Sequence, residues 1–333
     1  MTTTQIAFPT LVQEFFQRRL VAERQLSAHT IASYRDTFEL MLGYAQQRTG
    51  RTPSALTLQD LDAPLLLAFL DHLENQRGNC PRTRNLRLTA IRSFMNYASM
   101  RDPTSLPVAS RVLAISTKRF ERPALDFLSR AEVQALLDAP DRNTWSGDRD
   151  AALFAVLYNT GARVSEMTGL RITDVLLERS AAVHLHGKGR KKRIVPLWKS
   201  TAAQLRAWLS RIDNSPNAPV FPNRAGKPLS RSGVQHRLQT MIMKASARCP
   251  SLLGRQISPH SLRHASAMHL LQSGVDVNVI AMWLGHEDPA TTHLYVEADL
   301  AMKEAALKRL DELASRPVRF KARDRLLNFL ESL

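Results

Sequence analysis

Four short segments in the second half of the chain carry side chains that suit chemistry on a phosphate. In the first segment, Arg163 and Glu166 follow Gly161. Glycine commonly ends a helix, and residues three apart share a helical face, so Arg163 and Glu166 are expected to lie together at the start of the next helix. By itself this arrangement favours an ordinary surface ion pair.

The second segment is a glycine-rich turn at residues 187–190, with Lys188 near its tip. Short β-type runs at 182–186 and 192–197 flank the turn, and together they predict a β-hairpin. A turn of this composition is common, and alone it indicates only a solvated loop.

The third segment begins a helix at Pro259, which places His260 and Arg263 on the first turn. Free backbone N–H groups at a helix start also favour an anion. His260 and His264 have the spacing of a metal-binding pair. However, no glutamate follows His260 as in a zinc-protease motif, and no nearby carboxylate or thiol offers a third ligand, so we expect no metal.

The fourth segment, residues 283–295, contains His286 and ends at Tyr295. A single tyrosine near a helix start is usually a packing residue. Each of the four segments is therefore ambiguous when it is considered separately, and their meaning depends on the elements that would position them.

The first hundred residues predict four helices with a basic face and no strand. Apolar residues recur at helical spacing from Pro9 to about Glu23, Ser27 suits an N-cap for the second helix, and Pro64 suits the start of the third. The fourth helix is expected at 81–99. Its apolar side is expected to comprise Leu86, Ala90, Phe94 and Tyr97.

Residues 102–122 are rich in proline and basic residues, and they predict an irregular connector that could lie along a phosphate backbone or simply be solvated. Helices resume after it, with Ser129 as the expected cap of a helix at 131–138, and they continue beyond the hairpin to about Leu313. The tail at 316–333 is first basic and then apolar.

The composition agrees with a two-domain protein that binds a polyanion. The chain has 333 residues, with 46 Lys and Arg against 30 Asp and Glu, a formal net charge of +16. Such an excess points first to nucleic acid. With two cysteines, no apolar run long enough to span a bilayer and no secretory signal, we expect a cytoplasmic protein without membrane partners.

Together and in this order, the four segments resemble the tyrosine recombinase, or phage integrase, family. The resemblance implies a mainly α fold with a small β-hairpin or sheet, forming a C-shaped clamp on DNA. It implies a helical, SAM-like core-binding domain at 8–101, a linker at 102–122, a mixed α/β catalytic domain at 123–315 and the tail at 316–333.

The resemblance also implies a set of catalytic residues. Tyr295 matches the nucleophile, and Glu166 matches an acidic position next to the first arginine. The remaining catalytic positions are matched by Arg163, Lys188, His260, Arg263 and His286.

These residue types suit the chemistry that the resemblance implies. Two arginines, Arg163 and Arg263, can grip the phosphate oxygens, and His286 can donate a further hydrogen bond. Lys188 would protonate the 5′-oxygen leaving group, while His260 would accept the tyrosine proton or hold the phosphate. In this scheme protein cations take the place of metal ions, so we expect no metal and no other cofactor. No ATP is needed, because the energy of the broken bond is kept in a 3′-phosphotyrosine.

The expected partner is double-stranded DNA, bound by two protomers per site within a homotetramer. A partner recombinase or an accessory DNA-bending protein is also possible. Candidate phosphate contacts are Arg84, Arg87 and Arg190, and the apolar end of the tail at 316–333 could dock on a neighbouring protomer or on its own domain.

Three alternatives remain at this point. A type IB topoisomerase would share the chemistry but relax DNA without a specific site. A catalytically silent DNA-binding protein would have no use for the full residue set that ends at Tyr295. A metal-dependent nuclease would be inhibited by EDTA.

Overall fold

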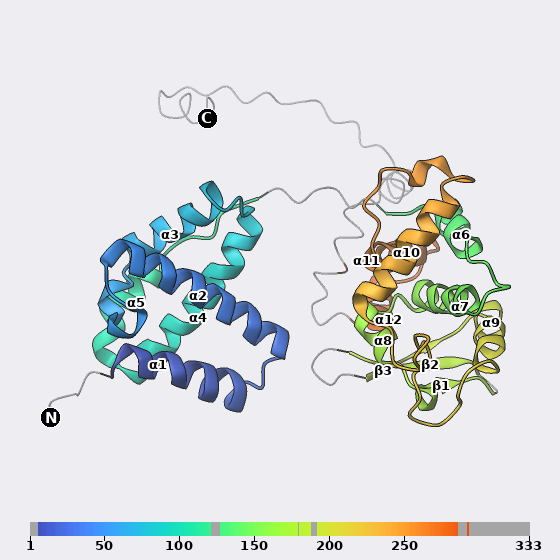
Figure 1. The fold of residues 1–333 in the computed structure, drawn as a ribbon, viewed down its shortest axis with the longest axis horizontal. Coiled ribbons are helices and arrows are strands. Elements are labelled where there is room, and N and C mark those ends of the chain that lie inside the picture. Colours follow the sequence, from blue (N-terminus) through green and yellow to red (C-terminus); the bar gives the residue numbers. More distant parts are fainter. Residues whose placement is uncertain (1–5, 121–126, 179, 188–191, 286–291, 293–333) are drawn as a thin grey trace, which may run out of the picture. The chain divides into compact units, whose positions relative to one another are not determined.

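The computed structural model describes residues 6–120, 127–178, 180–187, 192–285 and 292. The chain forms two compact units, Met1–Pro123 and Ala124–Leu333 (Figure 1). Each unit has its own hydrophobic core. The architecture is mainly helical with one small sheet, as the sequence predicted. Within the described residues, no helix is both long and apolar enough to cross a membrane.

The N-terminal unit is entirely helical in its described part. Its helices are α1 (Phe8–Glu14), the π-helical continuation Phe15–Glu23, α2 (Ala28–Thr49), α3 (Ala63–Asn75), α4 (Pro81–Arg101) and α5 (Leu106–Leu113), with 3-10 turns at Pro53–Ala55, Leu58–Asp60 and Pro103–Ser105. The predicted start signals are confirmed. Ser27 caps α2 by accepting a hydrogen bond from the Thr30 amide, Pro64 lies in the first turn of α3, and Pro81 begins α4.

The core of this unit is built around a cluster of aromatic rings. The Phe15 and Phe94 rings meet edge to face with centroids 5.4 Å apart, and Phe38 packs against both. The predicted apolar side of α4 is only partly right. Phe94 is buried as expected, but Leu86 is 61% exposed, and Leu88 is buried instead.

The expectation of an irregular connector from residue 102 is wrong for its first part. Residues 106–113 form α5, which packs against α4 and buries Ala109 and Val112. Pro107 is compatible with this helix because it lies in the first turn, where a missing N–H breaks no helical hydrogen bond. The chain after α5 is also fixed, since Asn85 and Lys118 exchange two hydrogen bonds of 2.8 and 3.1 Å.

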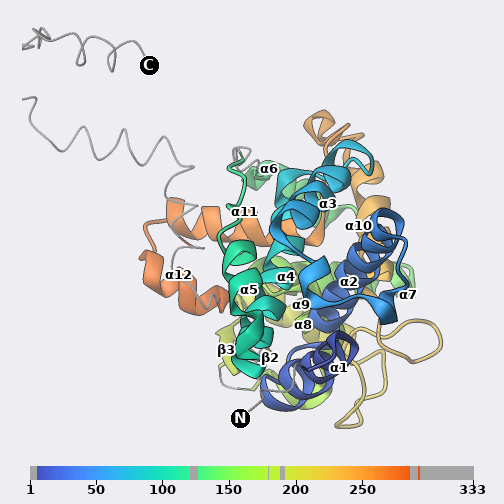
Figure 2. The ribbon, with the colours of Figure 1, turned by 90° about the vertical axis from the view of Figure 1, so that its left-hand side faces the viewer.

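The C-terminal unit packs helices around one small sheet. Its elements are α6 (Arg130–Asp138), α7 (Trp145–Thr160), α8 (Val164–Gly169), β1 (Val175–Leu176), β2 (Ala182–His186), β3 (Lys192–Pro196), α9 (Lys199–Leu209), α10 (Arg231–Ala245), α11 (Pro259–Gln272) and α12 (Val277–Leu284), with 3-10 turns at Ile172–Asp174 and Pro250–Leu252. Ser129 caps α6 as predicted. Figures 1 and 2 both show α11 beside α12.

The sheet is antiparallel, in the order β1-β2-β3, and includes the predicted hairpin. The two-residue strand β1 was not predicted. Val183 of β2 pairs with Val195 of β3, and both are buried against the core. Because side chains alternate along a strand, Arg193 lies on the same inner face of β3 as Val195. The sheet thus directs one arginine into the unit.

Candidate active site

The turn between α7 and α8 places Arg163. Gly161 ends α7 with a left-handed backbone (φ 58°), and a Cβ at this position would lie 2.4 Å from a methyl carbon of Leu284. Glycine is therefore required both by the backbone conformation and by the close approach of α12. Arg163 then precedes α8, and its amide donates to the Glu166 carboxylate at 2.7 Å.

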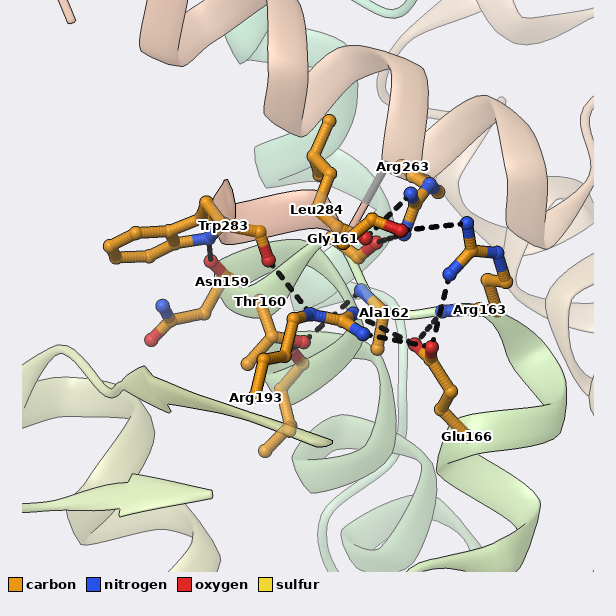
Figure 3. Close-up of polar contacts among 12 residues, drawn as sticks. Asn159, Thr160, Gly161, Ala162, Arg163, Glu166, Arg193, Arg263, Trp283 and Leu284 are labelled. Atoms are coloured by element: carbon orange, nitrogen blue, oxygen red, sulfur yellow. Dashed lines mark hydrogen bonds and ion pairs between the residues drawn. The ribbon is translucent and has the colours of Figure 1, made fainter. Parts of the chain in front are cut away.

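Glu166 is buried between two arginines, as Figure 3 shows. Arg163 Nη1 donates to Oε1 at 3.2 Å, while Arg193 donates from Nη1 to Oε1 and from Nη2 to Oε2, both at 2.8 Å. Burial alone would raise the pKa of Glu166, but the hydrogen bonds and charge of Arg193 and the contribution of Arg163 lower it overall. Glu166 is consequently a carboxylate at neutral pH.

Arg263, the fifth residue of α11, extends into the core. Pro259 begins this helix, as predicted from the sequence, and Ser258 caps it. Arg263 is only 1% exposed, and its guanidinium donates to the Gly161 carbonyl at 2.5 Å and to the Leu284 carbonyl at 2.8 Å. The α7–α8 turn and the end of α12 therefore hold this arginine from two sides.

Arg163 is held at the same junction. Its Nη2 donates to the Gly285 carbonyl at 3.1 Å, and its side chain is 35% exposed (Figure 3). Two guanidinium groups are thus anchored by main-chain carbonyls of neighbouring residues, Leu284 and Gly285. One of them is buried, and the other reaches the surface.

Two histidines of α11 lie beside these arginines. The rings of His260 and His264 meet edge to face, with centroids 4.3 Å apart. Burial, followed by the positive charges of Arg263 and Arg163, lowers the pKa of His260 below its ordinary value. Burial, His260 and Arg263 lower the pKa of His264 to about 4. Both imidazoles are therefore neutral at pH 7, when each has one nitrogen able to accept a proton.

Four of the sequence-predicted site residues meet at this junction: Arg163, Glu166, His260 and Arg263. The other predicted residues of the catalytic domain lie outside the described residues, namely Lys188, Arg190, His286 and Tyr295. Two of them are close in sequence to residues of the junction. Lys188 lies between β2 and β3, and His286 directly follows Gly285.

The two predicted phosphate contacts in the N-terminal unit differ in their surroundings. Arg84 is 3% exposed, and its Nε lies 3.5 Å from a carboxylate oxygen of Glu74. The pairing with a carboxylate indicates a structural ion pair in place of the expected phosphate contact. Arg87 is half-buried, and its Nη1 contacts the Thr37 hydroxyl at 3.5 Å.

Arg193 is a site residue that the sequence reasoning missed. It pairs with Glu166 across 27 positions of the chain, a separation that no helical or hairpin spacing reveals. The available signal was its place in the strand: alternation puts residue 193 on the same face as the apolar Val195. An arginine at an inward position requires a buried partner, and Glu166 is that partner.

Two family models match most of this chain. Residues 126–302 match the Phage integrase family, and residues 13–102 match the N-terminal SAM-like domain of phage integrases. A putative integrase/recombinase, y4rC, from Sinorhizobium fredii (strain NBRC 101917 / NGR234) is 50% identical over 97% of this chain and 97% of its own length.

A second relative and a solved structure extend the comparison. The tyrosine recombinase XerD of Pseudomonas putida (strain KT2440) is 33% identical over 86% of this chain and 91% of its own length. The XerH site-specific recombinase, solved in a post-cleavage complex with palindromic difH substrate, has the same fold, with a TM-score of 0.68 and 20% identity over 92% of this chain and 91% of the XerH chain. The chain therefore belongs to the phage integrase family of tyrosine recombinases, enzymes that break and rejoin DNA.

Proposed function

We propose that this recombinase cleaves and rejoins DNA at specific sites through a 3′-phosphotyrosine on Tyr295. The observation that carries the proposal is the junction where main-chain carbonyls hold Arg163 and Arg263 beside a neutral His260. Two fixed cations next to a proton acceptor suit a phosphodiester that is attacked by a hydroxyl group.

The two arginines form the phosphate clamp of this mechanism. A guanidinium stays charged at all relevant pH values and can bind two oxygens of a phosphate at once. As the tyrosine oxygen attacks phosphorus, negative charge grows on the non-bridging oxygens, and Arg163 and Arg263 stabilise it. Since their carbonyl anchors fix them before DNA binds, little reorganisation is needed in the transition state. His286 would donate a further hydrogen bond.

Two proton transfers accompany the exchange of the bonds to phosphorus. Neutral His260 accepts the proton of the Tyr295 hydroxyl as the new O–P bond forms, a role that its lowered pKa supports. The bond to the 5′-oxygen breaks, and Lys188 supplies the proton that turns this oxygen into a free hydroxyl. Rejoining is the same sequence in reverse, so neither ATP nor a metal ion takes part.

The substrate is double-stranded DNA, and a bacterial nucleoid is the proposed place of action. The XerH structure is of a protein bound to its DNA substrate, and the formal charge of +16 gives this chain a matching electrostatic preference. For this chain we infer a clamp of two domains on each half-site, two protomers per site and a homotetramer during strand exchange. The reaction would serve integration, excision, transposition or replicon resolution, with a partner recombinase or a DNA-bending protein where the site requires one.

The test is covalent trapping on DNA from the gene's own locus. A nicked duplex lets the short 5′-hydroxyl strand diffuse away, so that the protein–DNA ester accumulates. In EDTA, the wild-type protein is expected to form an SDS-resistant adduct, and Tyr295→Phe is expected to form none. An adduct that persists in Tyr295→Phe would identify a different nucleophile. DNA binding without any adduct would favour a catalytically silent protein.

The tail at 316–333 lies outside the described residues, and we propose from its sequence that it docks on a neighbouring protomer. Its end is apolar at Leu326, Leu327, Phe329 and Leu330. Deletion after Ser315 should leave binding of a single protomer to a half-site intact but reduce assembly into a synaptic complex, measured by native gel mobility. Unchanged synapsis and recombination in the deletion would disprove the docking.

A further inference from the structure

One guanidinium joins three separate chain segments of the candidate active site. Arg193 enters from β3, where its side chain is only 12% exposed. It binds both carboxylate oxygens of Glu166 at 2.8 Å, and its Nε donates to the Trp283 carbonyl at 2.9 Å. In Figure 3, Arg193 lies between Trp283 on one side and Glu166 on the other. A single side chain thus connects the hairpin, α8 and the end of α12.

Each of these segments leads to a proposed catalytic residue. The connection before β3 contains Lys188, the N-terminus of α8 follows Arg163, and His286 follows Gly285 at the end of α12. Arg193 itself is held away from the surface by the groups that it binds. Because Glu166 neutralises its charge and the Trp283 carbonyl binds its Nε, Arg193 is placed to fix the positions of catalytic groups and not to bind a phosphate.

The end of α12 is shaped to receive this side chain. Gly285 has a left-handed backbone (φ 65°), and a Cβ there would lie 3.0 Å from Nη1 and 3.2 Å from Cδ of Arg193. The guanidinium therefore packs directly on the glycine backbone. Any side chain at residue 285 would push against Arg193 and would also strain the turn.

Arg193 also decides how Glu166 interacts with Arg163. Glu166 is buried, so its charge needs close cationic partners. The Arg193 guanidinium takes both carboxylate oxygens at 2.8 Å, whereas the Arg163 guanidinium makes one longer contact of 3.2 Å. Of the two guanidinium groups that contact this carboxylate, only that of Arg163 would remain if Arg193 were removed. Electrostatic attraction would then draw the Arg163 guanidinium toward Glu166. The pairing with Arg193 keeps the guanidinium of Arg163 available for a phosphate.

We propose that Arg193 is a positioning residue for DNA cleavage: by neutralising Glu166 and binding the Trp283 carbonyl, it holds the hairpin, Arg163 and the segment before His286 in register. This inference rests on the proposed function. Lysine cannot replace arginine here, because an ammonium group lacks the planar fork that binds a carboxylate in two places and a carbonyl in a third.

The test compares Arg193→Gln and Arg193→Lys with Arg149→Gln. Arg149 is a matched control in the same unit: it is buried, donates twice to Asp150 at 2.7 and 3.0 Å, and donates once to the Pro222 carbonyl at 3.1 Å. Neither of its partners belongs to the candidate active site. Single-turnover cleavage of the nicked duplex is measured for each variant, per folded molecule, together with the dissociation constant for DNA.

Arg193→Gln should slow single-turnover cleavage on the order of 100-fold, the scale of loss for a misplaced catalytic group, while DNA affinity changes little. Arg193→Lys should recover only part of this rate. Arg149→Gln should cleave at the wild-type rate per folded molecule. Wild-type cleavage in Arg193→Gln, or equal slowing in Arg149→Gln, would overturn the proposal.

A double variant tests the route through Glu166. Once Glu166→Gln has removed the buried charge, Arg193→Gln should slow cleavage much less than it does in the wild-type background, because the two residues act as one unit. If the two losses instead multiply fully, the residues act independently and the proposal fails.

Hydrogen exchange provides a measurement that does not depend on cleavage. Loss of the bond from Arg193 to the Trp283 carbonyl should speed amide exchange in the peptide that contains residues 282–285, and Arg149→Gln should leave this peptide unchanged. Unchanged exchange in Arg193→Gln would refute the connection to α12. An absent Tyr295 adduct in the wild type would instead refute the proposed function, whatever the exchange shows.

Discussion

At the scale of single residues, the site depends on main-chain carbonyls that two glycine turns direct toward arginines. Gly161 and Gly285 both have left-handed backbones, and each offers a carbonyl to a guanidinium of the clamp: Gly161 to Arg263 and Gly285 to Arg163. Carbonyl acceptors orient a guanidinium without cancelling its charge. The arginines are therefore positioned while keeping the positive charge that a phosphate requires.

The two clamp arginines should differ in their effect on stability but not on cleavage. Arg263→Lys loses a fork of hydrogen bonds in a fully buried place, so the free energy of unfolding should fall by about 2–3 kcal/mol. Arg163→Lys, at a half-exposed place, should change it by less than about 1 kcal/mol. Each substitution should slow cleavage by about 10²–10³-fold, the loss expected when one preorganised hydrogen-bond donor is removed from an active site.

Urea unfolding and single-turnover cleavage measure these two effects separately. An unchanged free energy of unfolding in Arg263→Lys would show that the buried carbonyl contacts contribute little to folding. Wild-type cleavage in Arg163→Lys would show that a point charge suffices at that position, and that the bidentate geometry of arginine is not needed there.

The lowered pKa of His264, to about 4, predicts a dependence of stability on pH. The unfolded chain takes up a proton on this histidine near pH 6.5, whereas the folded state resists it, so acid favours unfolding. The contribution is fully present above about pH 6.5 and is lost as the pH falls toward 4. The free energy of unfolding can change by at most about 1.4 kcal/mol per pH unit through this one histidine, and solvent screening makes the change smaller.

Urea titrations at several pH values check this dependence. His264→Gln should lose less stability than the wild type between pH 6.5 and 4, and His236→Gln, at an exposed position of α10, controls for the removal of an imidazole. Parallel losses in the wild type and His264→Gln would contradict the assignment.

At the scale of elements, the sequence predicted what local signals determine. Ser27 and Ser129 each cap a helix, Pro259 begins one and Gly161 ends one, because such signals depend on residues within one turn of each other. The hairpin was equally visible from its alternation and its glycine turn. These elements bring Arg163, His260 and Arg263 to one junction, so much of the described site could be predicted.

The missed features depend on contacts between distant parts of the chain. Pro107 suggested a break, although it lies in the first turn of α5. Strand β1 has two residues, too few for an alternating pattern, and exists through its pairing with β2. Arg193 looked like one more basic residue of a basic chain, because its carboxylate partner is 27 positions away. These features depend on packing between segments that are far apart in the sequence, and local sequence patterns do not reveal such packing.

Helix α5 predicts where the N-terminal unit can be cut. A fragment of residues 6–118 retains the burial of Ala109, Val112 and Ile115, whereas a fragment that ends at residue 101 loses all three. Burying side chains of this size contributes about 3 kcal/mol or more in total. For a domain of this length, that loss lowers Tm by roughly 12–24 °C.

Circular dichroism melting of the two fragments measures the difference. The longer fragment should unfold cooperatively and at the higher temperature. Equal melting temperatures would mean that α5 and the chain to residue 118 add nothing to the fold, despite the hydrogen bonds between Asn85 and Lys118.

At the scale of the whole molecule, the count of 46 basic residues overstates the number of cations that are available to DNA, because a buried pair of an arginine and a carboxylate adds nothing to the net charge. The formal charge is +16 from 46 basic and 30 acidic residues. Several arginines, however, are committed to internal carboxylates. Arg84 pairs with Glu74, Arg149 with Asp150 and Arg193 with Glu166, and both side chains of each pair are largely buried. Such residues stabilise the fold and leave the exposed cations to meet phosphates.

Arg84 and Arg87 of α4 offer a direct test of this distinction, because only Arg87 extends to a half-exposed place. Each phosphate contact releases condensed counterions, so removal of one cation that binds phosphate lowers the slope of log affinity against log salt by about 1. Arg87→Gln should lower the slope by this amount on locus DNA and on an unrelated duplex alike. Arg84→Gln should leave the slope unchanged but destabilise the N-terminal unit, since it leaves Glu74 with a weaker set of partners.

Fluorescence anisotropy between 50 and 200 mM salt, with melting curves for both variants, measures slope and stability together. A reduced slope in Arg84→Gln would mean that this buried ion pair opens when DNA binds, and an unchanged slope in Arg87→Gln would remove α4 at this position from the DNA-binding surface.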